Sequence, residues 1–167
     1  CGRFRYFELA SDEIAAMLEK LAVDLPKNIR AAPDYSPVAP SLKRARFCYD
    51  HLAGELGVAI SSRLLDIGAL QLGDDAFEIS PAEHPIFEAL GVDLDLVRKK
   101  KRKLSPRCLD WSERVPHVAG ALGCAIAERF VELGYVSRSR DDRTAIISDK
   151  GTAFFQETFG IDFGAAQ

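Results

Sequence analysis

The sequence predicts a mainly helical α+β protein built from two copies of one module, each with the order helix, β-hairpin, helix. The first observation is an internal duplication, in which the segment 48–60 returns at 108–126 with six inserted residues, Trp111 to Pro116. The second is the hydrophobic pattern, which has helical spacing around each predicted hairpin. Because neither copy would bury its apolar faces alone, we expect the two copies to pack around a pseudo-twofold axis.

A strand, a helix and a linker are predicted before the duplicated modules. Residues 3–9 alternate polar with apolar side chains, which is typical of a half-buried strand. Ser11 and Asp12 are good helix starters, and one apolar stripe follows them as far as Pro26. Four prolines between positions 26 and 40 indicate a linker. The chain therefore divides into strand and helix at 1–25, Pro-rich linker at 26–40, and pseudo-repeats at 41–97 and 98–167.

The two pseudo-repeats follow the same predicted course. In the first, we expect a helix over about 41–67 ended by Gly68, a hairpin across 70–79, and a shorter helix over 80–90. In the second, we expect a helix over about 115–133 closed by Gly134, a hairpin across 135–147, and a helix over 148–159. Ser148 and Asp149 would cap that last helix.

The composition is that of a globular protein with a sizeable core. The chain has 167 residues, of which 47% are apolar and 28% charged. A net charge of −3 argues against binding nucleic acid through bulk charge. There is no apolar run long enough to span a bilayer, so we expect a cytoplasmic protein without membrane contact. The four cysteines have unrelated spacings and suggest reduced thiols, not a disulfide scaffold.

The duplicated segment carries two Cys/His pairs that could bind a metal ion. Cys48 and His51 are three residues apart on a predicted helix, so their side chains would share one face. Cys108 and His117 are the duplicated pair. If the axis brings the helix starts together, these four residues would close a tetrahedral site for zinc or another thiophilic ion. Asp50 and Asp110 would be further ligands or would orient the imidazoles.

Other interpretations of the same residues stay open. The cysteines suit small buried hydrophobes, the aspartates suit helix caps, and the histidines suit hydrogen-bonded core residues. A redox or small-molecule role is a third possibility. A thiol or hydrolytic enzyme would use one Cys/His pair as nucleophile and base. The chain has no glycine-rich phosphate loop and no nucleophile elbow, so the sequence predicts a protein that is not an enzyme.

The insertion and a basic segment offer two more sites. Trp111 would supply a flat apolar wall, and Glu113 and Arg114 could orient a polar ligand beside it. The alternative is that the insertion only caps a helix and packs. Residues 98–103 form a block of six like charges, which suits contact with a phosphate backbone or a solvated surface.

The opening residues and the two repeated motifs together resemble one family of regulators, and the resemblance spans nearly the whole chain. The opening Gly2-Arg-Phe-Arg-Tyr-Phe-Glu-Leu9 with its following helix resembles the second wing strand and last helix of the ArsR (SmtB/ArsR) family of winged-helix repressors. The motifs that begin Cys48-Tyr-Asp-His-Leu-Ala-Gly and Cys108-Leu-Asp-Trp-Ser-Glu resemble the long C-terminal extension of a subset of these proteins. The hairpin at 135–147 resembles a DNA-binding wing, so both pseudo-repeats are expected to be winged-helix-like.

The resemblance implies a homodimeric transcriptional repressor whose extension senses a small-molecule or metal effector. Its helix-turn-helix, which would contact operator DNA, is expected before residue 1. Arg3 and Arg5 would be remnants of a wing that touches phosphates. The competing hypothesis is an interaction domain in which the Cys/His pairs hold a structural ion and sense nothing.

Overall fold

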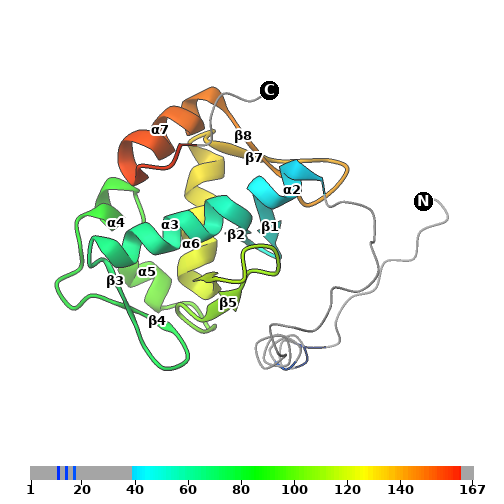
Figure 1. The fold of residues 1–167 in the computed structure, drawn as a ribbon. Coiled ribbons are helices and arrows are strands. Elements are labelled where there is room, and N and C mark those ends of the chain that lie inside the picture. The colour runs from blue at the N-terminus through cyan, green and yellow to red at the C-terminus, as the bar shows by residue number, and fades with distance from the viewer. Residues whose placement is uncertain (1–10, 12–13, 15–16, 18–38, 163–167) are drawn as a thin grey trace. The chain divides into compact units, whose positions relative to one another are not determined.

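The computed structural model describes residues 11, 14, 17 and 39–162 (Figure 1). The chain divides into two compact units, Cys1–Ser36 and Pro37–Gln167, and each is described by itself. In the first unit, Ile14 and Met17 are helical, and the Ile14 amide donates to Ser11 Oγ at 3.4 Å. The predicted strand at 3–9, the rest of the predicted helix and residues 26–38 of the linker lie outside the described residues.

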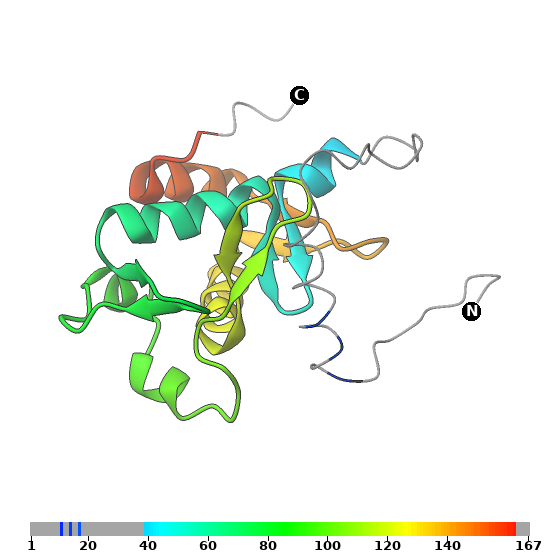
Figure 2. The same ribbon diagram turned by 60° about the horizontal axis from the view of Figure 1, so that its bottom comes forward.

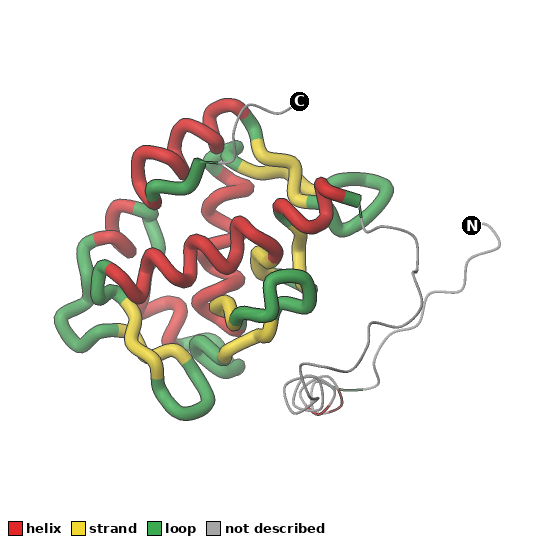
Figure 3. Tube along the Cα trace, viewed as in Figure 1, coloured by secondary structure: helices red, strands yellow, loops and turns green. Residues whose placement is uncertain are grey.

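The second unit alternates hairpins of short strands with helices (Figures 1 and 3). Its helices are α2 (Pro40–Arg44), α3 (Gly54–Asp66), α4 (Ile86–Ala89), α5 (Leu94–Arg98), α6 (Gly120–Glu132) and α7 (Asp149–Phe159). Its strands are β1 (Arg46–Cys48), β2 (His51–Ala53), β3 (Leu70–Leu72), β4 (Phe77–Ile79), β5 (Arg107–Leu109), β6 (Pro116–Val118), β7 (Val136–Arg138) and β8 (Ala145–Ile147). Across residues 39–162 the strands pair in sequence order as separate antiparallel hairpins.

The same order of elements occurs in both halves of this unit. The first half runs β1, β2, α3, β3, β4 and α4, and the second runs β5, β6, α6, β7, β8 and α7. The predicted hairpins across 70–79 and 135–147 form in the structure. The last helix begins as predicted, because Ser148 Oγ accepts a hydrogen bond from the Gly151 amide.

The predicted long helices start too early. The helix predicted over 41–67 is divided: its first residues belong to the short helix α2, residues 46–53 form the β1–β2 hairpin, and the long helix α3 begins only at Gly54. The helix predicted over 115–133 likewise begins at Gly120, after β6. Gly54 and Gly120 have φ of +77° and +68°, a left-handed conformation that no helix interior contains. The helix predicted over 80–90 is wrong for most of its length, since only Ile86–Ala89 is α-helical.

The two halves interlock through reciprocal contacts. β6 packs against α3, and β2 packs against α6, so each half supplies a hairpin to the long helix of the other. Backbone hydrogen bonds add to this: the Phe47 amide donates to the Arg143 carbonyl, and the Phe77 amide donates to the Ser105 carbonyl. One hydrophobic core therefore runs through both halves, and its fully buried members include Leu56, Leu64, Leu122, Phe130 and Phe155.

Among the described residues, no helix is both long enough and apolar enough to span a bilayer.

Candidate metal centre

The four predicted ligands come from two hairpins that lie next to each other. Cys48 is directly opposite His51 in the β1–β2 register, and Cys108 is directly opposite His117 in the β5–β6 register. Directly opposed side chains of an antiparallel pair point to the same face, so each hairpin presents one thiol and one imidazole together. In Figure 2 the cyan β1–β2 hairpin lies beside the yellow-green β5–β6 hairpin.

The location of these pairs corrects the prediction that each lies on a helix face. The spacings of three and nine residues are equivalent in the structure, because the six inserted residues lengthen the loop between β5 and β6 without changing the register. The sequence therefore identified the right partners in each half and placed them on the wrong kind of element. The structure brings all four residues together, which the duplication allowed if the two copies meet at these segments.

The distances within the cluster fit a tetrahedral ion. The Sγ atoms of Cys48 and Cys108 are 3.9 Å apart, the Nε2 atoms of His51 and His117 are 3.2 Å apart, and all four ligand atoms lie within 4.8 Å of one another. Tetrahedral zinc with Zn–S bonds of about 2.3 Å and Zn–N bonds of about 2.05 Å would separate the sulfurs by about 3.8 Å and the nitrogens by about 3.3 Å. The cluster could therefore hold a metal ion of that size.

Each imidazole has an aspartate behind it. His51 Nδ1 lies 3.4 Å from Asp50 Oδ1, and His117 Nδ1 lies 3.7 Å from Asp110 Oδ2. His117 Nδ1 is buried and has no hydrogen-bond partner at this distance. With both Nδ1 atoms protonated toward these carboxylates, both Nε2 lone pairs would face the same centre and would repel unless a cation lay between them. Carboxylate, imidazole and metal in a row is a recurrent arrangement at zinc sites.

Asp110 is held by a buried network that the sequence did not reveal. Arg46 is 1% exposed and donates from Nη2 to Asp110 Oδ1 at 2.6 Å, while its Nη1 donates to Ser112 Oγ at 3.1 Å. The Gly54 amide donates to Asp110 Oδ2 at 2.7 Å. Burial would raise the pKa of Asp110, but these hydrogen bonds outweigh it and lower the pKa well below its ordinary value. The available signal was an arginine placed between the apolar residues Ala45 and Phe47, just before the repeated segment.

Asp50 is held from the surface side. Arg102, which belongs to the basic segment 98–103, donates through both terminal nitrogens to the Asp50 carboxylate. Burial would raise the pKa of Asp50, and the bond from Arg102 opposes it, so the pKa lies below its ordinary value. In the same segment Arg98 pairs with Glu83, and Lys99, Lys100 and Lys101 are exposed.

The thiols of the cluster differ from Cys124. The neighbouring Cys108 thiol lowers the pKa of Cys48 most; burial opposes this, and the two imidazoles add to it, so the pKa of Cys48 falls far below its ordinary value. The thiolate is the form that binds metals. Burial and the nearby carboxylates of Asp50 and Glu128 raise the pKa of Cys124 to about 11. Cys124 is not a member of the cluster.

The inserted loop supports Asp110. The amide of Glu113 donates to Asp110 Oδ1 at 3.1 Å, and the amide of Arg114 donates to the Asp110 carbonyl at 2.9 Å. The Trp111 ring is 45% exposed and lies 4.2 Å from the guanidinium carbon of Arg46. A ligand site formed by the Trp111, Glu113 and Arg114 side chains stays a prediction.

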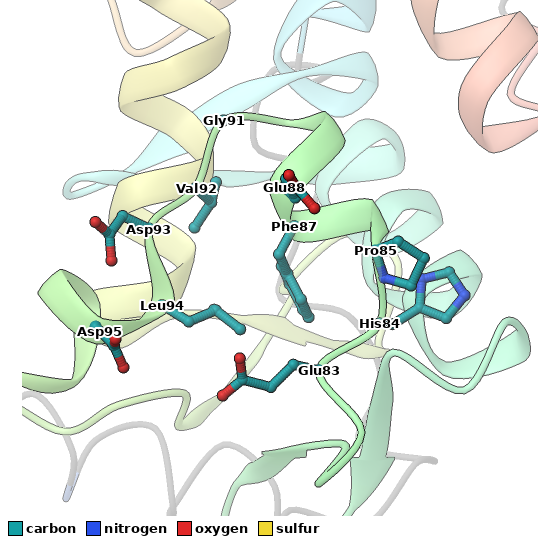
Figure 4. A pocket seen from close by; sticks show the side chains of 10 residues that line it. All are labelled: Glu83, His84, Pro85, Phe87, Glu88, Gly91, Val92, Asp93, Leu94 and Asp95. Carbon is teal, nitrogen blue, oxygen red and sulfur yellow. The ribbon is translucent and has the colours of Figure 1, made fainter.

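A surface cavity of about 450 Å³ lies apart from the cluster (Figure 4). Its lining comes from the segment 83–95 around α4 and α5 and includes the acidic side chains of Glu83, Glu88, Asp93 and Asp95. None of the predicted site residues lines it. Arg3 and Arg5, predicted to touch phosphates, lie outside the described residues.

One comparison with known proteins shows the broad class. The chain is 36% identical over 160 residues to the uncharacterized HTH-type transcriptional regulator YdfF of Bacillus subtilis (strain 168), covering 96% of this chain and 71% of that protein. No family model and no solved structure matches the chain. At this identity and coverage the two proteins share a family, and the chain belongs to the HTH-type (helix-turn-helix) transcriptional regulators.

Proposed function

We propose that this chain is the effector-responsive region of an ArsR-like repressor, and that its effector site is the cluster of Cys48, His51, Cys108 and His117 with one bound zinc ion. The convergence of these four side chains from two hairpins carries the proposal. Two thiolates and two imidazoles suit zinc, because thiolate selects thiophilic ions and imidazole suits zinc. The resemblance of the chain's first residues and repeated motifs to the ArsR family supports the finer assignment.

The position of the cluster explains how zinc could act on DNA binding. Each pair of ligands belongs to a different half, so an ion at the cluster would tie the β1–β2 hairpin to the β5–β6 hairpin. A signal alters DNA affinity only if the ion binds one arrangement of the protein more tightly than the other. Loss of the ion would release the two hairpins from each other. The β1–β2 hairpin packs on α6 through β2, and the β5–β6 hairpin packs on α3 through β6.

A structural ion without sensing is the second candidate. It is favoured by the burial of one side of the cluster, where Cys108 is 4% exposed and His117 and Asp110 are each 1% exposed. A site whose four ligands all come from the protein holds zinc as part of the fold. The two candidates predict the same metal content and differ only in whether the metal changes operator affinity.

The regulator is proposed to act in the cytoplasm as a homodimer. The helix that contains Ile14 and Met17 supports this, because both side chains are exposed, 41% and 62% respectively, although both are apolar. In the ArsR family, the corresponding helix is expected to contribute to the dimer.

Operator binding by the full-length regulator tests the proposal. Zinc content is measured after gel filtration in chelator-free buffer, and operator affinity is measured by fluorescence anisotropy with zinc and after chelation. We expect one zinc per chain and an affinity change between about 5-fold and 150-fold. C108A should lose the bound zinc and the zinc-dependent change in operator affinity. C124A, which changes a thiol outside the cluster, should keep the zinc and the affinity change. Bound zinc that does not change operator affinity would reject the effector site and support the structural ion. A wild-type protein without bound zinc would overturn both candidates.

A further inference from the structure

The two sides of the Cys/His cluster differ in exposure. On one side, the side chains of His117 and Asp110 are 1% and 0% exposed, and the Arg46 partner of Asp110 is 1% exposed. On the other side, the side chains of His51 and Asp50 are 8% and 23% exposed, and the Arg102 partner of Asp50 is 39% exposed. Cys48 is also only partly buried, whereas Cys108 is buried. The cluster therefore has a closed side and an open side.

Each side has the same order of contacts, from an arginine to an aspartate to a histidine. On the closed side, Arg46 holds Asp110, which faces His117. On the open side, Arg102 holds Asp50, which faces His51. The Arg102 pair is different in origin, because Arg102 comes from the exposed basic segment and not from a hairpin. The main chain beside it is fixed, since the amides of Ala121 and Leu122 at the start of α6 donate to the carbonyls of Lys103 and Leu104.

We infer that the Arg102–Asp50 pair is a latch on the open side, and that it sets the rate at which the metal ion enters and leaves the cluster. The inference rests on the proposed zinc site. An incoming competing ligand, such as a thiol or a chelator, reaches the partly buried Cys48 side of the cluster before the buried Cys108. Stepwise replacement of Cys48 and then His51 follows more easily when Asp50 no longer orients His51. Residues that orient a metal ligand in this way change metal affinity by about 10- to 100-fold.

Arg102 and Asp50 are thus positioning residues, which act on the ion through His51. The two aspartates have different roles. Asp110 is fixed by the buried Arg46, Gly54 and the loop amides, and its loss would disturb the fold. Asp50 lies in the two-residue turn between β1 and β2, is partly exposed, and is paired with the surface Arg102, so its loss should alter exchange with little effect on folding.

The test measures zinc transfer from the full-length protein to the chromophoric chelator 4-(2-pyridylazo)resorcinol by stopped-flow absorbance. We expect R102A and D50N to release zinc about tenfold faster than the wild type. R102K should restore part of the slow release, because lysine keeps the charge but not the two-pronged contact. The double variant should be no faster than either single variant, since both changes break one pair.

Two controls separate the latch from general loosening. R98A removes a neighbouring arginine of the same basic segment whose partners are Glu83 and Asp95, and it should release zinc at the wild-type rate. Cobalt substitution should give the same tetrahedral absorption bands in R102A as in the wild type. Equal release rates in R102A and the wild type, or equal acceleration in R98A, would overturn the latch while leaving the zinc site standing. If no variant binds zinc, the proposed site fails and the latch with it.

Discussion

His51 and His117 are separated by 66 positions in the sequence, and their Nε2 atoms are 3.2 Å apart. Their rings are tilted by 37° with centroids 5.1 Å apart, so the nitrogen edges approach each other without the rings stacking face to face. If both Nδ1 atoms carry their protons toward Asp50 and Asp110, the two Nε2 lone pairs face each other without a proton between them and repel. A cation between the two Nε2 atoms would remove that repulsion, whereas a proton on one Nε2 would make the same approach a hydrogen bond, so the response to zinc distinguishes the two.

Zinc should stabilise the protein in proportion to its concentration. A ligand that binds only the folded state adds about 2.7 kcal/mol at one hundred times its dissociation constant. We therefore expect the melting temperature to rise with added zinc and to fall with chelator, as measured by circular dichroism. H117A should have the same melting temperature with zinc as with chelator, and the melting temperature of C124A should respond to zinc like that of the wild type. A zinc response that survives in H117A would place the ion elsewhere.

Arg46 and Asp110 should be among the most sensitive positions for folding. Removal of one partner of a buried ion pair leaves an uncompensated charge and costs about 3–5 kcal/mol. We expect R46A and D110A each to lower the urea midpoint by a corresponding amount. The double variant should lose much less than the sum of the two. R98A breaks exposed pairs with Glu83 and Asp95 and should leave the midpoint nearly unchanged. Strict additivity at Arg46 and Asp110 would contradict the network described above.

Gly54 should resist substitution more strongly than Gly68. Both have left-handed φ, +77° and +72°, so alanine at either position pays a conformational cost of about 1–2 kcal/mol. A Cβ at Gly54 would also overlap the Lys43 carbonyl oxygen, whereas one at Gly68 meets nothing within 4 Å. G54A should therefore lose more unfolding free energy than G68A. It should also weaken the bond from its own amide to Asp110. Equal losses in the two variants would show that the backbone near Lys43 yields.

The three described cysteines should react with iodoacetamide in different ways. With zinc bound, Cys48 and Cys108 are protected, and chelation should expose the partly buried Cys48 first. Cys124, with a pKa of about 11, has roughly one part in a thousand thiolate at pH 8, so its labelling should be slow and should rise about tenfold per pH unit toward its pKa. Peptide mapping by mass spectrometry at pH 8 and pH 9.5 measures each site. Fast labelling of Cys124 at pH 8 would show that its surroundings are more open than described.

The outer elements of each module were predictable because their signals are local. The hairpin across 70–79 has its turn residues between two apolar runs, and the last helix has Ser148 as its cap. The β1–β2 and β5–β6 hairpins had no such signal. They are stabilised by hydrogen bonds to distant residues such as Arg143 and Ser61. A spacing of three between Cys48 and His51 suits a helix face as well as a tight turn, so local pattern alone favoured the wrong element.

The sequence by itself determined which side chains correspond in the two copies. The duplication paired Cys48 with Cys108 and His51 with His117, because a repeated module repeats its chemistry. Only the tertiary structure decided how they meet: two hairpins present each pair, and the inserted residues lengthen a loop without moving His117 out of register. It also decided the roles of Arg46 and Arg102, since one arginine is buried and the other is partly exposed. Burial and approach across more than fifty residues depend on packing, which no short stretch of sequence encodes.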